Sequence, residues 1–202
     1  MSNTLLLASQ SRARHQLLTT AGISFKVIPQ NANERDCDWT MPLPQLLEHI
    51  ARKKMECAEL PQGIENEVLF VLTADTMVQD MGGVIYGKPE SKNEAIAAIQ
   101  GVRKGARAGT CFCIEKKIYH NQKWITQQEI VQYVESSYVF NMPDECIETY
   151  FEYEPNYISI SGAVTVEGYA LQFLESIRGS YSNILGLPLF EVRQALIQLK
   201  FF

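Results

Sequence analysis

Residues 68–76 read Val-Leu-Phe-Val-Leu-Thr-Ala-Asp-Thr, a continuous apolar run that leads directly into a polar turn. Such a run is typical of a strand that is covered on both faces, as in the parallel sheets of α/β proteins. Asp75 follows at the carboxyl end of this strand, where open α/β sheets place their ligand sites. An aspartate that caps the next turn is the alternative, and position alone leaves both interpretations open.

The segments around this strand alternate between strands and helices. Residues 4–8 predict a buried strand, Leu17, Leu18 and Ala21 keep helical spacing before Gly22, and residues 25–28 predict a second strand. This strand–loop–helix–strand unit favours a parallel α/β arrangement. Further helices are expected over residues 42–59, 94–99, 144–153, 170–177 and 189–199, and two antiparallel strands over 109–118 and 129–140. We therefore expect one α/β domain over residues 1–202, with a mixed twisted sheet and flanking helices.

Composition excludes several classes of protein. The 202 residues include 23 acidic and 18 basic side chains, a net charge of −5, with 46% hydrophobic and 20% charged residues. A disordered chain would be poorer in apolar residues, and a nucleic-acid-binding surface would favour a basic balance. No apolar run is long enough for a membrane helix, and the start lacks the features of a signal peptide. We expect a cytoplasmic protein without nucleic-acid or membrane partners.

Cysteines and histidines are few and scattered. Five cysteines and three histidines form no CxxC pair and no zinc-ligand spacing. Free thiols in a reducing compartment fit this pattern better than disulfides do. Cys111 and Cys113 stand in an alternating apolar stretch, where two residues on the same face of a strand are the simpler explanation. With so few histidines, general base catalysis would fall on a carboxylate.

Two loops carry residues suited to anions. Ser9 and Arg14 lie in the first strand-to-helix loop, where a hydroxyl, a guanidinium and helical N–H groups can bind an anion; a capped helix with solvated arginines is the alternative. The stretch from Gly82 to Lys88 nearly matches a P-loop, but Pro89 follows where a Ser or Thr is required. Lys88 remains a candidate positive charge on a backbone stiffened by proline.

Two further charged residues remain ambiguous. Lys54 lies in a basic run that favours a solvated helix face, although its place beside the apolar stripe would let it point inward. Glu34 follows the second strand and is either a metal ligand or an exposed loop acid.

Five short motifs, taken in order, resemble those of the Maf-like nucleotide pyrophosphatases. They are LLASQSRAR at 6–14, IARKKM at 50–55, TADTMV at 73–78, GKP at 87–89 and FLESIRGSYSNILGLPL at 173–189. The resemblance runs nearly from end to end. It implies the fold of the inosine-triphosphate pyrophosphatases, with two lobes around a nucleotide-binding cleft, and a homodimer.

The resemblance also implies an activity and residue roles. The reaction is hydrolysis of a nucleoside triphosphate to the monophosphate and pyrophosphate, with house-cleaning of modified nucleotides as the role. Asp75 matches the position of the family's general base. Glu34 and Asp75 match positions that bind magnesium or manganese. Ser9, Arg14, Lys54 and Lys88 fall on residues around the triphosphate.

Markers of base preference are mixed. The threonine at position 76 resembles the residue found in the branch that acts on dTTP and UTP. The glutamate at position 167 resembles the residue found in the branch that acts on 7-methyl-GTP. A carboxylate accepts hydrogen bonds and suits the donor edge of a guanine, which favours 7-methyl-GTP. The resemblance implies that the position of Ala13 reads the base, and alanine there matches neither branch.

Other departures favour a different class of function. Arg12 replaces the usual proline, Ala13 the following arginine, and Asn31 and Asn33 stand where the family has aspartates. These losses suit a nucleotide-binding or regulatory protein without turnover, and the family is also linked with septum formation. That alternative is opposed by the acids and lysines that the chain retains, which are Glu34, Lys54, Asp75 and Lys88.

Overall fold

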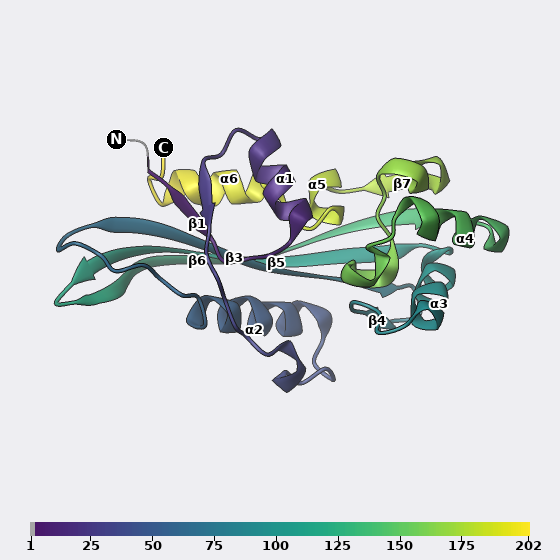
Figure 1. Ribbon diagram of the computed structural model, residues 1–202, viewed down its shortest axis with the longest axis horizontal. Coiled ribbons are helices and arrows are strands. Elements are labelled where there is room, and N and C mark those ends of the chain that lie inside the picture. The colour runs from purple at the N-terminus through teal and green to yellow at the C-terminus, as the bar shows by residue number, and fades with distance from the viewer. Residues whose placement is uncertain (1–2) are drawn as a thin grey trace. The chain divides into compact units, whose positions relative to one another are not determined.

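The computed structural model describes residues 3–202, apart from the side chain of Arg35, and has a mixed α/β fold (Figure 1). Its seven-stranded sheet has the order β2-β1-β3-β5-β6-β7, with β4 paired to β3. β1 is parallel to β2 and β3, whereas β4 and β7 are antiparallel to β3 and β6. The strands are β1 (Leu5–Leu7), β2 (Phe25–Val27), β3 (Val68–Asp80), β4 (Ile85–Tyr86), β5 (Ala106–His120), β6 (Lys123–Phe140) and β7 (Leu174–Arg178). The predicted mixed sheet with flanking helices is confirmed.

The chain divides into two compact units. Unit 1 contains residues 1–75, 111–133 and 186–202, and unit 2 contains residues 76–110 and 134–185. β3, β5 and β6 each continue from one unit into the other. The single domain over residues 1–202 and the nucleotide-binding cleft between two lobes stay predictions.

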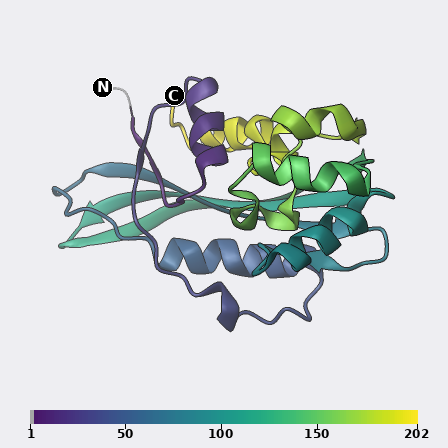
Figure 2. The ribbon, with the colours of Figure 1, turned by 45° about the vertical axis from the view of Figure 1, so that its right-hand side comes forward.

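Unit 1 buries its strands between helices. Figures 1 and 2 show α1 (Arg12–Thr20) and α6 (Leu189–Gln198) on one face of β1 and β3, with α2 (Leu43–Glu56) on the other. This arrangement explains why Leu5–Leu7 and the 69–72 run of β3 are buried throughout. The predicted 42–59 helix is α2, and its buried stripe is Leu43, Leu46, Leu47, Ile50, Ala51, Lys54 and Met55.

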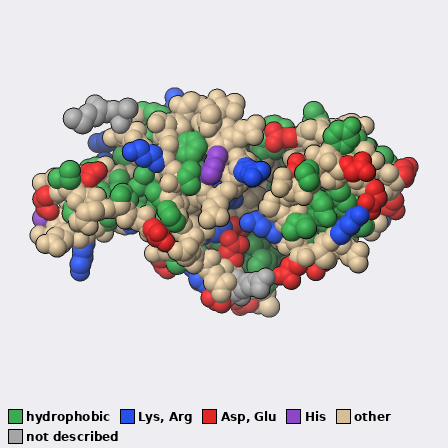
Figure 3. All heavy atoms as spheres, in the orientation of Figure 1, with side chains coloured by type: hydrophobic (Ala, Val, Ile, Leu, Met, Phe, Trp, Pro, Cys, Tyr) green, Lys and Arg blue, Asp and Glu red, His purple; other side chains and the backbone are tan. Residues whose placement is uncertain are grey.

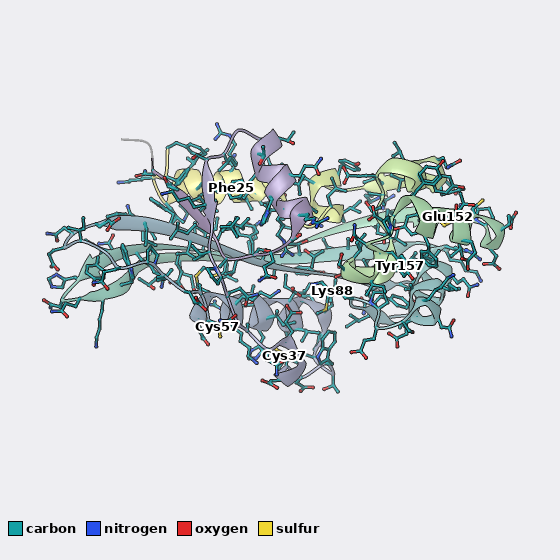
Figure 4. The ribbon with its side chains drawn as sticks, in the orientation of Figure 1. Phe25, Cys37, Cys57, Lys88, Glu152 and Tyr157 are labelled. Carbon is teal, nitrogen blue, oxygen red and sulfur yellow. The ribbon has the colours of Figure 1, made fainter. Side chains whose placement is uncertain are left out.

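The cysteines of unit 1 belong largely to its core. Cys111 and Cys113 are buried in β5, in agreement with two residues on one face of a strand. Burial raises the pKa of Cys111 to about 12 and raises that of Cys113 as well, so both stay neutral thiols at physiological pH. Cys37 is buried in the segment that follows the 3₁₀ helix Glu34–Asp36 (Figure 4).

Unit 2 has its own core. Buried Val78, Ile99, Phe140 and Tyr150 belong to one hydrophobic cluster. Its helices are α3 (Lys92–Val102), α4 (Asp144–Tyr153) and α5 (Tyr181–Ile184). Three 3₁₀ helices, Tyr157–Ser159, Ser161–Ala163 and Gly168–Phe173, fill the segment between α4 and β7. Figure 3 shows hydrophobic side chains exposed among acidic ones where α4 lies, and Tyr153 is 69% exposed.

The helix expected over residues 170–177 is wrong. Those residues form the end of a 3₁₀ helix and then β7, which pairs antiparallel with β6. The register shifts between Val139 and Phe140, so that Ile177 pairs with Tyr138 and Leu174 with Phe140. A bulge adds one residue to one strand, so two apolar residues three apart can share a face. Leu174 and Ile177 both pack against the core, with a spacing of three residues that is also typical of a helix.

Within the described residues, no helix has the length and apolar character needed to cross a membrane.

Candidate active site

Asp75 lies near the middle of β3, in a part of the strand fixed against α2. The buried hydroxyl of Thr73 donates a 2.8 Å hydrogen bond to the carbonyl of Ala51 in α2. Lys54 stands three residues after Ala51 and therefore projects from the same side of the helix. Its ammonium contacts Asp75 Oδ1 at 2.5 Å. β3 continues to Asp80, so Asp75 lies within the strand. Its expected place at the carboxyl end of a strand and its interpretation as a turn cap are therefore both wrong.

Lys54 joins two acids. Its Nζ also lies 2.8 Å from Oε1 of Glu34, in the 3₁₀ helix Glu34–Asp36. The side chains of Lys54 and Asp75 are only 7% and 10% exposed, and that of Glu34 is 34% exposed. Buried charges are costly unless they are paired. The structure therefore selects the inward interpretation of Lys54, whereas Arg52 makes exposed ion pairs with Glu48 and Glu129.

Arg14 is the second buried cation of unit 1. Its Nε donates to the carbonyl of Gly186 at 2.9 Å, and its Nη1 donates to Ser9 Oγ at 3.1 Å. Burial lowers the pKa of Arg14, while the nearby carboxylates of Asp75 and Glu34 raise it. A guanidinium stays charged in proteins, so Arg14 carries a fixed positive charge beside the two acids.

Arg14 belongs to the first turn of α1 rather than to the loop before it, and neighbouring residues complete this region. The ring Nε2 of His15 lies 2.8 Å from the carbonyl of Ser9, and the Ser11 hydroxyl caps α1 by accepting from Arg14 N. Gly186 has φ +111°, which favours glycine, and this conformation presents its carbonyl to Arg14. Ala13 is half-buried in the first turn of the same helix. Gly186 belongs to the closing motif at 173–189, but that motif does not indicate that Arg14 is its partner.

Glu34 and Asp75 are suited to a divalent cation. Both carboxylates reach one nitrogen, so their oxygens converge on a small volume. Mg²⁺ is commonly held by one or two carboxylates together with substrate phosphates. Asn31 and Asn33 bond instead to Glu59, at 2.5 Å, and to Asp36, at 2.8 Å.

A second cluster of possible ligands lies on β5 and β6. Cys113, Glu115 and Glu129 bring their ligand atoms together. Arg52 pairs with Glu129 and Lys117 with Glu115, so cations of the chain already neutralise both carboxylates.

The remaining predicted residues belong to unit 2. Thr76 Oγ1 lies 3.0 Å from Thr110 Oγ1, and its carbonyl accepts a 2.9 Å hydrogen bond from the Ser161 hydroxyl. Lys88 is exposed after β4 (Figure 4). Glu167 is exposed. Burial raises the pKa of the Tyr181 phenol, and the nearby carboxylate of Glu167 raises it further.

The candidate residues thus form two sets. Unit 1 brings together Ser9, Arg14, Glu34, Lys54 and Asp75, with Ala13 in the same helix as Arg14. Unit 2 holds Thr76, Lys88 and Glu167, together with Ser161 and Gly162, which the sequence did not indicate. The roles of these residues stay predictions.

Comparison with known proteins gives matches over nearly the whole chain. The family model described as "Maf-like protein" matches residues 4–199. A dTTP/UTP pyrophosphatase of Caldicellulosiruptor bescii is 30% identical, covering 96% of this chain and 94% of the relative. A dTTP/UTP pyrophosphatase of Syntrophus aciditrophicus is 33% identical, covering 97% of this chain and 90% of the relative. A nucleoside triphosphate pyrophosphatase of Legionella pneumophila is 28% identical, covering 97% of this chain and 94% of the relative.

Proposed function

This chain belongs to the Maf-like protein family, and we propose that it hydrolyses a nucleoside triphosphate to the monophosphate and pyrophosphate. The observation that carries the proposal is the buried Lys54 ammonium in contact with both Asp75 and Glu34, beside buried Arg14. Two acids and two cations balance one another in the free protein. The same groups can rearrange around a triphosphate with its counter-ion. The names of the relatives support this reaction.

Arg14 and Lys54 provide the positive charge for the phosphates. Phosphate oxygens accept charge-assisted hydrogen bonds from both side chains, and a guanidinium can bind two oxygens at once. The Ser9 hydroxyl already accepts from Arg14, so its own proton remains available to a phosphate oxygen. Glu34 and Asp75 would hold Mg²⁺ or Mn²⁺, whose charge offsets that of the phosphates and stabilises the transition state.

Asp75 is the group we assign as general base. A water oxygen attacks the α-phosphorus, and the bond from this phosphorus to the oxygen that bridges to the β-phosphorus breaks. Pyrophosphate leaves with the electron pair of that bond, and Asp75 accepts the proton of the water. Lys54 contacts Oδ1, so Oδ2 is the atom we assign to receive the proton. General base catalysis of this kind contributes about 10²–10⁴-fold to a rate.

Two observations bear on the base. The names of two relatives, dTTP/UTP pyrophosphatases, together with Thr76, support a pyrimidine substrate. Exposed Glu167 accepts hydrogen bonds only, which supports the donor edge of 7-methyl-guanine. None of the names of these relatives mentions 7-methyl-GTP. Both substrates therefore belong in the decisive assay.

Pyrophosphate release across dTTP, UTP, CTP, GTP and 7-methyl-GTP, with Mg²⁺ or Mn²⁺, tests the proposal. We expect the wild-type protein to release pyrophosphate from at least one nucleotide, and Asp75→Asn to lower kcat about 10³-fold while nucleotide binding persists. Asp38→Asn is the matched control, because Asp38 is exposed in the same unit and accepts from Thr40. Nucleotide binding without release by the wild-type protein would contradict the enzyme and favour a binding protein.

A further inference from the structure

The Ser161–Ala163 segment contacts strand β3 at Thr76 and the loop that carries Lys88, and both hold candidate substrate-binding residues. The Ser161 hydroxyl donates to the carbonyl of Thr76 at 2.9 Å. The next N–H, that of Gly162, donates to the carbonyl of Gly87, also at 2.9 Å. Two consecutive residues therefore tie the polar stretch of β3 to the loop that carries Lys88.

Gly162 is required at this point by conformation and by space. Its φ is +71°, a region that L side chains rarely adopt. A Cβ added to Gly162 would lie 3.2 Å from Cβ of Val78, which is buried on β3. A larger residue would have to push the segment away from β3. The N–H of residue 162 would then move away from Gly87.

The hydrogen bond to Gly87 acts directly on the backbone of Lys88. The Gly87 carbonyl belongs to the peptide bond that enters Lys88, so its direction sets the plane of that peptide. On the other side, buried Pro89 restricts Lys88 to extended conformations. The backbone of Lys88 is thus held from both sides.

The side chain of Lys88 contrasts with its backbone. It is exposed, and its ammonium makes no ion pair or hydrogen bond with the described part of the chain. A charge that has no internal partner and stands on a fixed backbone is preorganised for an external anion. This is the condition that a phosphate-binding lysine needs.

The segment is itself anchored to the core of unit 2. The Tyr150 hydroxyl donates to the carbonyl of Ala163 at 3.0 Å and accepts from the N–H of Thr165 at 3.1 Å. Tyr150 is fully buried in α4, and burial raises its pKa, so the phenol keeps its proton. Movement of Ser161 and Gly162 is therefore restrained by a rigid part of the unit.

We propose that Ser161 and Gly162 are positioning residues, which hold the Lys88 backbone so that its ammonium meets the phosphates of the nucleotide. This inference rests on the proposed function, because it takes Lys88 as a phosphate ligand. Ser161 fixes the segment against Thr76, and Gly162 transmits that position to Gly87. Neither residue contacts the nucleotide.

A double-mutant cycle with Lys88 tests the inference. Ser161→Ala should raise KM about fivefold with kcat within about twofold, since it removes one hydrogen bond. Ser161→Thr, which keeps the hydroxyl, should restore KM. The matched control is Ser159→Ala, because Ser159 is exposed in the same segment and its hydroxyl bonds locally to the carbonyl of Asn156.

In the Lys88→Ala background, Ser161→Ala should have no further effect, since the two residues act through one ammonium. An equal, additive effect there, or an effect no larger than that of Ser159→Ala, would overturn the inference. So would a Lys88→Ala variant that behaves as wild type. The cycle is measured also as Kd for dTTP and 7-methyl-GTP. Binding then tests the inference even if wild-type turnover fails, which would instead contradict the proposed function.

Discussion

The two units hold their candidate residues in different ways. Unit 1 buries its charged groups and neutralises them with one another, as Lys54 does with Asp75 and Glu34. Unit 2 leaves Lys88 and Glu167 exposed and fixes the backbone that precedes Lys88 through hydroxyl and backbone hydrogen bonds. The first arrangement depends on side-chain charge, and the second depends on backbone position.

This difference separates the expected consequences of mutation. Removing one partner from a buried charge cluster leaves the others uncompensated, so stability and chemistry fall together. Changing an exposed, backbone-held residue removes contacts with the ligand and leaves the fold intact. Substitutions in unit 1 should therefore affect kcat and unfolding, and those in unit 2 should affect KM and base preference.

Lys54→Met gives the largest expected effect. It leaves the carboxylates of Asp75 and Glu34 without their cation, so we expect a loss of about 3 kcal/mol in the free energy of unfolding. Pyrophosphate release should fall at least about 10²-fold, since a positive charge at the phosphates is lost.

Lys53→Met is its control. Lys53 donates to the carbonyl of Asn33 at 2.8 Å and lies 3.6 Å from Asp36 on the more exposed side of α2, so its loss should cost less than about 1 kcal/mol. Urea unfolding monitored by circular dichroism measures both variants. Equal midpoints for the two would show that the buried pairs do not stabilise unit 1.

Glu167→Gln should change base preference and leave the fold unaffected. An amide presents a donor as well as an acceptor, so relative rates should move about tenfold from 7-methyl-GTP toward dTTP and UTP. Glu152→Gln is the control, because Glu152 is an exposed acid of α4 in the same unit (Figure 4). A substrate profile that does not change with Glu167→Gln would remove this residue from base recognition.

Ala13→Arg tests the smallest effect, within the otherwise charged unit 1. A guanidinium in the first turn of α1 would add a charge beside the Ser9 loop, and KM should fall about fivefold. Gln16→Arg adds the same charge to an exposed position of that helix and should leave KM unchanged. An unaltered KM for Ala13→Arg would indicate that Arg12 already fills the role.

The sequence predicted the elements whose signal is local. The apolar run at 68–72 predicted a strand covered on both faces, and the stripe through Leu46, Leu47 and Ile50 predicted α2. It also singled out Asp75 as a carboxylate that follows a buried apolar run, but it placed the end of the strand there, whereas β3 continues to Asp80. Burial of an apolar stripe follows from spacing along the chain, so these features needed no knowledge of distant contacts.

Only the tertiary structure decided between alternatives that depend on a distant partner. Lys54 points inward because Asp75 and Glu34, which are remote in sequence, meet its ammonium. Leu174 and Ile177 belong to a strand because β6 pairs with them across a bulge, which local spacing could not show. Ser161 and Gly162 carry no chemical motif, and their contacts with Thr76 and Gly87 arise from hydrogen bonds between distant segments. A sequence specifies the face that a residue prefers, whereas the partner on that face is set by packing.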